Sequence, residues 1–350
     1  MKIRKGSAAE TIMLVIGYCG GMPISMLKMY VGYHDYNRRV VTALLREGYL
    51  QERRFQSEDR HVVRSLRISK AGMEILRENC PENADEIERH LFSPEDGMGN
   101  WKRTKRLHRG AACLLLAIRL GAQFRPVPEK DEAIGKRLVY YSAYEFNKRY
   151  EQDNKSARVN GVLISRERLY YPMYYLGSHN LFWNPEVETG FRKRFEASEL
   201  GRGLNYGCTI LIADDWMLAA NLVSHISNRR SRMIRITDST QFRMITFDYH
   251  GLLLLWLLMD ERRKWALGHF LERRINLPFS TTPKYMFDLR QIEDFRPATN
   301  SRDQFFRPDH GAFFSFQIPV MQKITVEGVE LQSIPAELLE AFYEEYTADG

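Results

Sequence analysis

Cysteine is scarce in this sequence, with only 4 residues in 350, and they lie far apart at positions 19, 80, 113 and 208. No two of them form a CxxC pair, and no histidine lies at the spacing that metal ligands need. We therefore expect neither a zinc site nor a framework of disulfide bonds. No other sequence pattern indicates a cofactor-binding site, so no cofactor is expected.

Long apolar runs are missing as well. The longest one, GLLLLWLLM at 251–259, is far too short to span a bilayer. Basic residues precede the run TIMLVIGY at 11–18, but this run is better explained as a buried first helix than as a signal peptide. These two observations predict a cytoplasmic protein.

Several catalytic motifs are also absent. The sequence has no GxxxxGK[ST] loop and no GxSxG elbow, and its glycine-rich stretch at 201–207 precedes a strand-like run where a phosphate loop would precede a helix. A metal-dependent nuclease would need converging carboxylates, and the residues to test for this are Asp214, Asp215, Asp248 and His250. The competing explanation is that Asp214 caps a helix and Asp248 ends a strand. We expect a protein that is not an enzyme.

Positive charge is concentrated at the N-terminus. The hydrophobic share of 44% and the charged share of 27% are ordinary for a folded soluble protein. The net charge is +7, and residues 1–80, with fourteen basic and eight acidic side chains, carry +6 of it. A basic module attracts a polyanion through counterion release, and DNA is the commonest one. The alternative is that a modest excess of charge only keeps the protein soluble.

The stretch from Pro23 to Ser69 has the pattern of a winged helix-turn-helix. A short helix is predicted from Pro23 to about Tyr30, because proline suits the first helical position. After a turn, a second helix is predicted over Asp35–Glu47, with Asp35 or His34 as its cap. Its apolar stripe is formed by Tyr36, Val40, Val41, Leu44 and Leu45.

The wing of this motif follows the second helix. Strands are predicted at 49–56 and 61–68 around the charged turn Ser57–Arg60. Ser69 then caps a closing helix over residues 70–79. The order is therefore three helices, a strand, a wing, a strand and a fourth helix.

Two sets of side chains would contact DNA in such a module. Candidates for base edges in the major groove are Asn37, Arg38, Arg39 and Thr42 on the second helix. Candidates for phosphates or for the minor groove are Lys28 and the wing residues Arg53, Arg54, Arg60 and Arg64.

The rest of the chain suggests a second domain. Residues 81–100 are acidic, end in Gly, Pro and Asn, and include a short helix near 85–91, so they are predicted to be a linker. A basic cluster at 101–109 opens a long helix, and it is either a second phosphate contact or the solvated end of a buried helix. Strand-like runs at 208–213, 242–249, 285–292 and 313–320 then alternate with helices at 214–225, 251–274 and 335–346. The predicted class is mixed α+β, with a winged helix-turn-helix at 1–80, a linker at 81–100 and a mixed α/β domain at 101–350.

Three segments resemble a known family. They are LRISKAGMEIL at 66–76, LHRGAACLLLAIRLGAQF at 107–124 and SARVNGVLISRERLYYPMYYLG at 156–177. With them the chain is similar to the replication-relaxation family of plasmids and integrative elements. That resemblance implies a winged helix before a restriction-endonuclease-like α/β domain. It also implies a role in plasmid replication, DNA relaxation or conjugative mobilisation.

One departure from the family pattern bears on activity. An early strand of the nuclease-like domain in this family often carries Pro-Asp, whereas the corresponding hairpin here has Asn160, Gly161 and Val162. The resemblance then implies a binding domain on a degenerate enzymatic scaffold.

The leading expectation is a sequence-specific, non-catalytic accessory protein of a plasmid or integrative and conjugative element, acting in the relaxosome or in replication. Its expected partners are duplex DNA, a relaxase or another protein of the element, and a second copy of the chain. Three alternatives stay open: a transcriptional regulator of the same element, a metal-dependent nuclease built on Asp248, and a winged helix that binds protein.

Overall fold

The computed structural model describes residues 3–56, 61–90, 101–124, 132–143, 145, 159–177, 185–218, 242–275, 310–319, 322 and 330–348. Contacts divide the chain into two compact units. The N-terminal unit comprises residues 1–175 and 196–205, and the C-terminal unit comprises residues 176–195 and 206–350. The described residues contain both helices and strands, which confirms the mixed α+β class. The division at 81–100 stays a prediction, and residues 91–100 lie outside the described part.

The first helix, α1 (Ala8–Cys19), contains the apolar run at 11–18 as expected. The hydroxyl of Ser7 accepts a hydrogen bond from the backbone N–H of Glu10 at 3.3 Å and so caps its start. Gly20 ends the helix with a φ of 65°. Most side chains of α1 are buried, so this helix is the centre of the N-terminal core.

The next two elements differ in detail from the prediction. Strand β1 (Met22–Pro23) leads into a 3-10 helix, η1 (Ile24–Met29), where an α-helix beginning at Pro23 was expected. Helix α2 (His34–Arg46) then begins one residue earlier than predicted. Neither His34 nor Asp35 caps it, because both lie within its first turn, and Tyr33 at the cap position makes no side-chain cap bond.

The buried stripe of α2 is also displaced from the predicted one. Its fully buried residues are Asn37, Val41 and Leu44, spaced four and three positions apart. Tyr36 precedes this stripe by one position and is 56% exposed, so its assignment to the apolar stripe is wrong. One position corresponds to roughly 100° around a helix, which moves Tyr36 to the flank.

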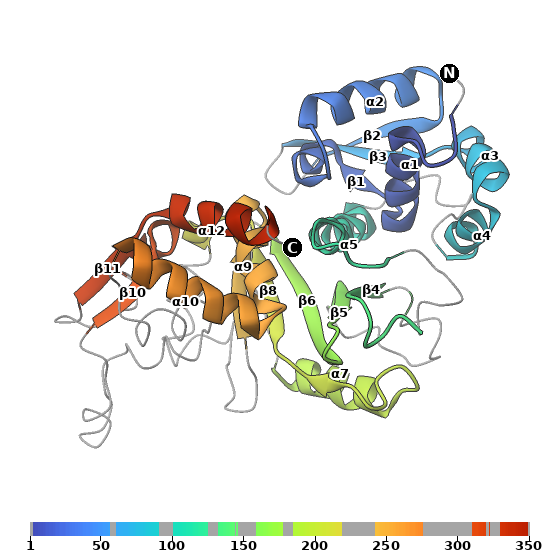
Figure 1. Cartoon of the computed structure of the whole chain (residues 1–350). Coiled ribbons are helices and arrows are strands. Elements are labelled where there is room, and N and C mark those ends of the chain that lie inside the picture. Colours follow the sequence, from blue (N-terminus) through green and yellow to red (C-terminus); the bar gives the residue numbers. More distant parts are fainter. Residues whose placement is uncertain are drawn as a thin grey trace. The chain divides into compact units, whose positions relative to one another are not determined.

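A three-stranded sheet completes residues 1–80. Strands β2 (Leu50–Gln56) and β3 (Val62–Ile68) pair in antiparallel fashion as predicted, and β1 joins the other side of β3. The hydroxyl of Ser69 accepts from the N–H of Gly72 at 3.0 Å, which confirms it as the cap of α3 (Lys70–Asn79). Helix α4 (Pro81–His90) follows and contains part of the helix expected at 85–91. Figure 1 shows these elements in blue and cyan.

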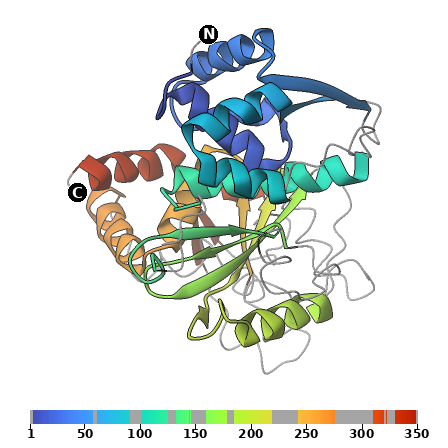
Figure 2. The same ribbon diagram turned by 90° about the vertical axis from the view of Figure 1, so that its right-hand side faces the viewer.

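Helix α5 (Trp101–Arg119) has packing partners on two sides. It contacts α1, β1 and η1, and it also contacts β4 (Val139–Ser142) and β5 (Gly161–Ile164). Strands β4, β5 and β6 (Leu169–Gly177) pair in that order as antiparallel neighbours. Figure 2 shows α5 lying between the first helices and strands β4 and β5.

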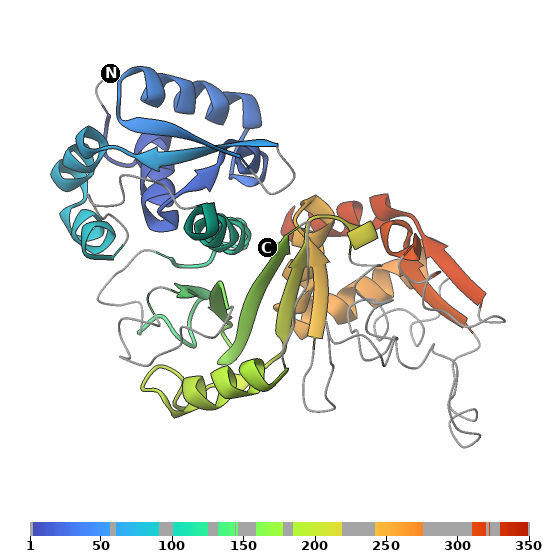
Figure 3. The ribbon, with the colours of Figure 1, turned by 180° about the vertical axis from the view of Figure 1, so that it is seen from behind.

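The C-terminal unit alternates strands and helices. Its described elements are α7 (Pro185–Ala197), β7 (Asn205–Tyr206), β8 (Thr209–Ala213), β9 (Phe242–Thr246), α9 (Tyr249–Leu258), α10 (Glu261–Ile275), β10 (His310–Phe314), η5 (Ser315–Gln317), β11 (Glu330–Ile334) and α12 (Ala336–Ala348). Strands β8 and β9 are parallel, as are β10 and β11. Figure 3 shows the last helices and strands in orange and red.

Two predictions for this unit need correction. The single helix expected at 251–274 is divided, because the Asp260 carboxylate accepts from the N–H of Arg262 at 2.9 Å and begins a new helix there. The strand expected at 313–320 ends at Phe314 and gives way to η5. The strand expected at 285–292 lies outside the described residues. No helix in the described part is long and apolar enough to cross a membrane.

Candidate nucleic-acid interface

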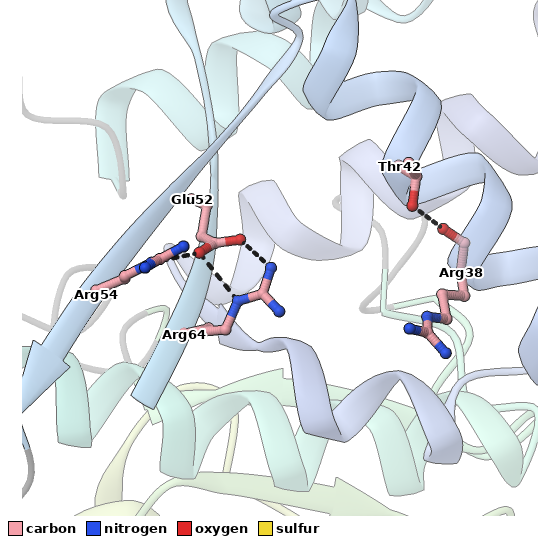
Figure 4. A network of polar contacts seen from close by, with 5 residues as sticks. All are labelled: Arg38, Thr42, Glu52, Arg54 and Arg64. Carbon is pink, nitrogen blue, oxygen red and sulfur yellow. Dashed lines mark hydrogen bonds and ion pairs between the residues drawn. The ribbon is translucent and has the colours of Figure 1, made fainter. Parts of the chain in front are cut away.

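The exposed side of α2 carries Arg38, Arg39 and Thr42, and we call these three residues the α2 face. The Thr42 hydroxyl donates a hydrogen bond to the backbone carbonyl of Arg38 at 2.9 Å (Figure 4). Among the described residues, neither Arg38 nor Arg39 has an ion-pair partner. Both guanidinium groups can therefore donate hydrogen bonds to a ligand.

Asn37 is placed differently from its predicted role. Its side chain is only 2% exposed, and its amide nitrogen donates to the carbonyl of Val31 at 3.0 Å. The residue lies four positions before Val41, and this spacing turns it toward the core. Contact between Asn37 and a base edge does not fit this placement, because the amide instead ties α2 to the turn before it.

The far end of the β2–β3 hairpin carries two exposed arginines, Arg54 and Arg64, which we call the wing pair. Their side chains are 73% and 54% exposed, and they lie directly opposite each other in the strand register. Like charges in opposite positions of an antiparallel pair repel each other. The carboxylate of Glu52 offsets this repulsion, because its Oε1 accepts from the Nε of each arginine at 3.0 Å. Figure 4 shows the three side chains together.

Glu52 was missed by the sequence analysis. Strand alternation places residues 52 and 54 on one face, so the signal was present in the sequence. A hydrogen bond from Arg64 is the main cause that lowers the pKa of Glu52 to about 2, although partial desolvation acts in the opposite direction. The carboxylate is thus charged throughout the neutral and mildly acidic range.

Of the other predicted phosphate contacts, Lys28 and Arg53 lie in the described part of the chain. Lys28 is exposed on η1. Arg53 is half-buried and lies opposite Ser65, on the other face of the hairpin from Arg54. Arg60 lies outside the described residues. The structure therefore places Arg54 and Arg64 together and sets Arg53 apart from them.

The basic cluster at the start of α5 contains both buried and exposed side chains. His108 is only 6% exposed, and its Nε2 lies 2.9 Å from the hydroxyl oxygen of Ser65. Burial, with a smaller contribution from the charge of Arg67, lowers the pKa of His108 to about 4. His108 is accordingly a packing residue, whereas Arg103 and Arg106 are exposed to solvent.

Two of the residues proposed for a nuclease site, Asp215 and Asp248, cap helices. Asp248 caps α9, since its Oδ1 accepts from the N–H of Gly251 and from the hydroxyl of Thr246, both at 2.8 Å. The helix that begins at residue 216 is capped by Asp215, where Asp214 was expected: Oδ1 of Asp215 accepts a hydrogen bond from the N–H of Leu218 at 2.7 Å.

The histidine of that set has a partner as well. The Nε2 atom of His250 lies 2.9 Å from a carboxylate oxygen of Glu340. Within the described ranges, no group of three or more His, Cys, Asp or Glu side chains is arranged to hold a metal ion. The geometry of these residues therefore gives the nuclease alternative no support.

Comparison of the chain with protein-family models, curated proteins and solved structures finds no match in any of the three. The resemblance to the replication-relaxation family consequently stays a prediction.

Proposed function

We propose that the N-terminal unit binds duplex DNA through a winged helix-turn-helix. In this proposal η1 and α2 are the two helices of the motif, α2 enters the major groove, and the β2–β3 hairpin is the wing. The element order from α1 to α3 supports the assignment, as does the antiparallel pairing of the hairpin. The concentration of positive charge in residues 1–80 supports a polyanionic partner.

The α2 face is the observation that carries this proposal. The side chains of Arg38 and Arg39 are exposed on α2, whereas Val41 and Leu44 are buried. A guanidinium fork matches the O6 and N7 acceptors of guanine, and a threonine methyl can contact the methyl group of thymine. Arg38, Arg39 and Thr42 would read bases, whereas Lys28, Arg54, Arg60 and Arg64 would contact phosphates or the minor groove.

We propose that the biological role is that of a non-catalytic accessory protein in the relaxosome or replication apparatus of a plasmid or integrative and conjugative element. This step rests on the family resemblance. The proposed partners are duplex DNA, a relaxase or another protein of the element, and a second copy of the chain. The C-terminal α/β part would be a restriction-endonuclease-like scaffold without activity.

A transcriptional regulator of the same element would use the same DNA chemistry, so binding alone does not separate the two roles. Genomic context does separate them. An adjacent relaxase gene supports the accessory role, and a divergent promoter with an inverted repeat supports the regulator.

The binding proposal is tested by a mobility-shift titration at fixed salt, with DNA from the element's origin and promoter. We expect the double variant Arg38→Ala/Arg39→Ala to lose specific affinity by at least about tenfold, since a bidentate base contact contributes about 1–3 kcal/mol. The matched control is Arg262→Ala/Arg273→Ala, which removes two exposed arginines from α10. Equal binding by the two double variants would show that α2 does not read DNA.

A further inference from the structure

The wing pair lies where the hairpin leaves the core. On the face shared by Leu50, Glu52 and Arg54, the residues opposite them on β3 are Ile68, Leu66 and Arg64. Leu50 and Leu66 are buried, whereas Arg54 and Arg64 are exposed. Glu52, with a side chain that is 18% exposed, stands at the boundary between the two regions.

Glu52 fixes the direction of both arginines at once. Its Oε1 binds the Nε of Arg54 and the Nε of Arg64, and its Oε2 binds Nη2 of Arg64. A guanidinium has five N–H donors, so each arginine keeps donors that Glu52 does not use. The carboxylate can therefore orient both side chains while they bind another anion.

We infer that Glu52 is a positioning residue that holds Arg54 and Arg64 as one pre-ordered phosphate-binding pair. This inference rests on the proposed DNA-binding function and names how its wing contacts the backbone. Long arginine side chains lose conformational freedom when they bind, and ordering them in advance removes part of that cost.

The positioning role can be separated from the charge of Glu52. A carboxylate beside a phosphate is repulsive, so its charge alone would weaken DNA binding. Positioning of the arginines acts in the opposite direction and strengthens it. If repulsion dominates, removal of the Glu52 charge strengthens DNA binding. If positioning dominates, the same change weakens it.

The test compares Glu52→Gln with Glu88→Gln in the full-length chain. Glu88 on α4 forms an ion pair with Arg77 on α3. Its substitution by Gln therefore also removes one negative charge and one glutamate–arginine ion pair. The affinity for a duplex from the element's origin is measured at several salt concentrations, and thermal unfolding confirms that each variant is folded.

We expect Glu52→Gln to bind the duplex about tenfold more weakly than Glu88→Gln, and the slope of log affinity against log salt to fall by about one. Binding by Glu52→Gln that equals or exceeds that of Glu88→Gln would overturn the inference. If the wild-type protein itself shows no salt-dependent duplex binding, the proposed function fails first.

A second variant keeps the inference testable if Glu52→Gln does not fold. Arg64→Lys retains the charge but loses the planar fork that binds both oxygens of Glu52. We expect it to lose affinity to a similar extent. An Arg64→Lys protein that binds as tightly as wild type would show that the orientation of the pair is unimportant.

Discussion

The hydroxyl oxygen of Ser65 on β3 lies 2.9 Å from the Nε2 atom of His108 on α5, and both side chains are buried. These residues are 43 positions apart in the chain. Through this contact the helix after the predicted linker packs on the sheet that carries the proposed wing.

This buried histidine predicts that stability depends on pH. Its folded-state pKa of about 4 is below the ordinary value of 6.5, so the unfolded chain takes up the proton first as the pH falls. The stability contributed by neutral His108 is therefore complete above pH 6.5 and is lost as the pH falls toward 4. The loss should approach about 3 kcal/mol in the free energy of unfolding, because each pKa unit corresponds to about 1.4 kcal/mol.

Urea unfolding between pH 7 and pH 4 measures this dependence. Other groups titrate in the same range, so the difference between wild type and His108→Gln isolates the histidine. His269→Gln is the control, since His269 is more exposed on α10. A wild-type curve parallel to that of His108→Gln would contradict the assignment.

Asn37 is predicted to matter for stability. Asn37→Ala removes the hydrogen bond to the carbonyl of Val31 and should lower the free energy of unfolding by about 1–3 kcal/mol. Arg38→Ala on the exposed side of the same helix should leave it within about 0.5 kcal/mol of wild type. Chemical unfolding of both variants decides the matter, and a neutral Asn37→Ala would mean that the buried amide is dispensable.

Gly72 allows α3 to approach the beginning of β2 closely. A Cβ at this position would lie 2.2 Å from the carbonyl oxygen of Tyr49, which is backbone and cannot move aside easily. We expect Gly72→Ala to destabilise the protein by more than about 2 kcal/mol through overpacking. Gly110→Ala on α5 is the control, because a Cβ there meets nothing within 4 Å. That variant should gain up to about 1 kcal/mol from helix propensity, and similar melting temperatures for the two would refute the close approach.

The structural role of Asp248 leads to a prediction about cleavage. Asp248→Ala removes the cap of α9 and should cost about 1 kcal/mol of stability. Supercoiled plasmid incubated with Mg²⁺ or Mn²⁺ should stay intact with the wild-type protein and with the variant. Nicking by wild type that Asp248→Ala abolishes would instead revive the nuclease alternative.

Local signals in the sequence were sufficient to predict the hairpin and the start of α3. The period-two alternation of β2 and β3 needs only neighbouring residues, and so does the cap formed by Ser69 three positions before its partner Gly72. These elements are specified by contacts within a short length of chain.

Local sequence was not sufficient to predict which side of α2 faces the core, or which residues Glu52 and His108 contact. In a short helix the apolar pattern does not fix the buried stripe to better than one position. Tyr36, predicted to be buried, is therefore exposed, and its neighbour Asn37, predicted to be exposed, is buried. Alternation could place Glu52 beside Arg54, but the contact with Arg64 depends on strand register. The partner of His108 depends on packing between distant segments.

Helix α5 limits where this protein can be divided. It packs against α1 and β1 on one side and against β4 and β5 on the other, so a cut before residue 101 would expose the surface that α5 shares with α1 and β1. The unit that could pass by recombination from one gene to another therefore includes α5. A segment that carries the proposed DNA-binding elements together with α5 would also take away the helix that packs on β4 and β5, so its exchange alone would uncover those strands.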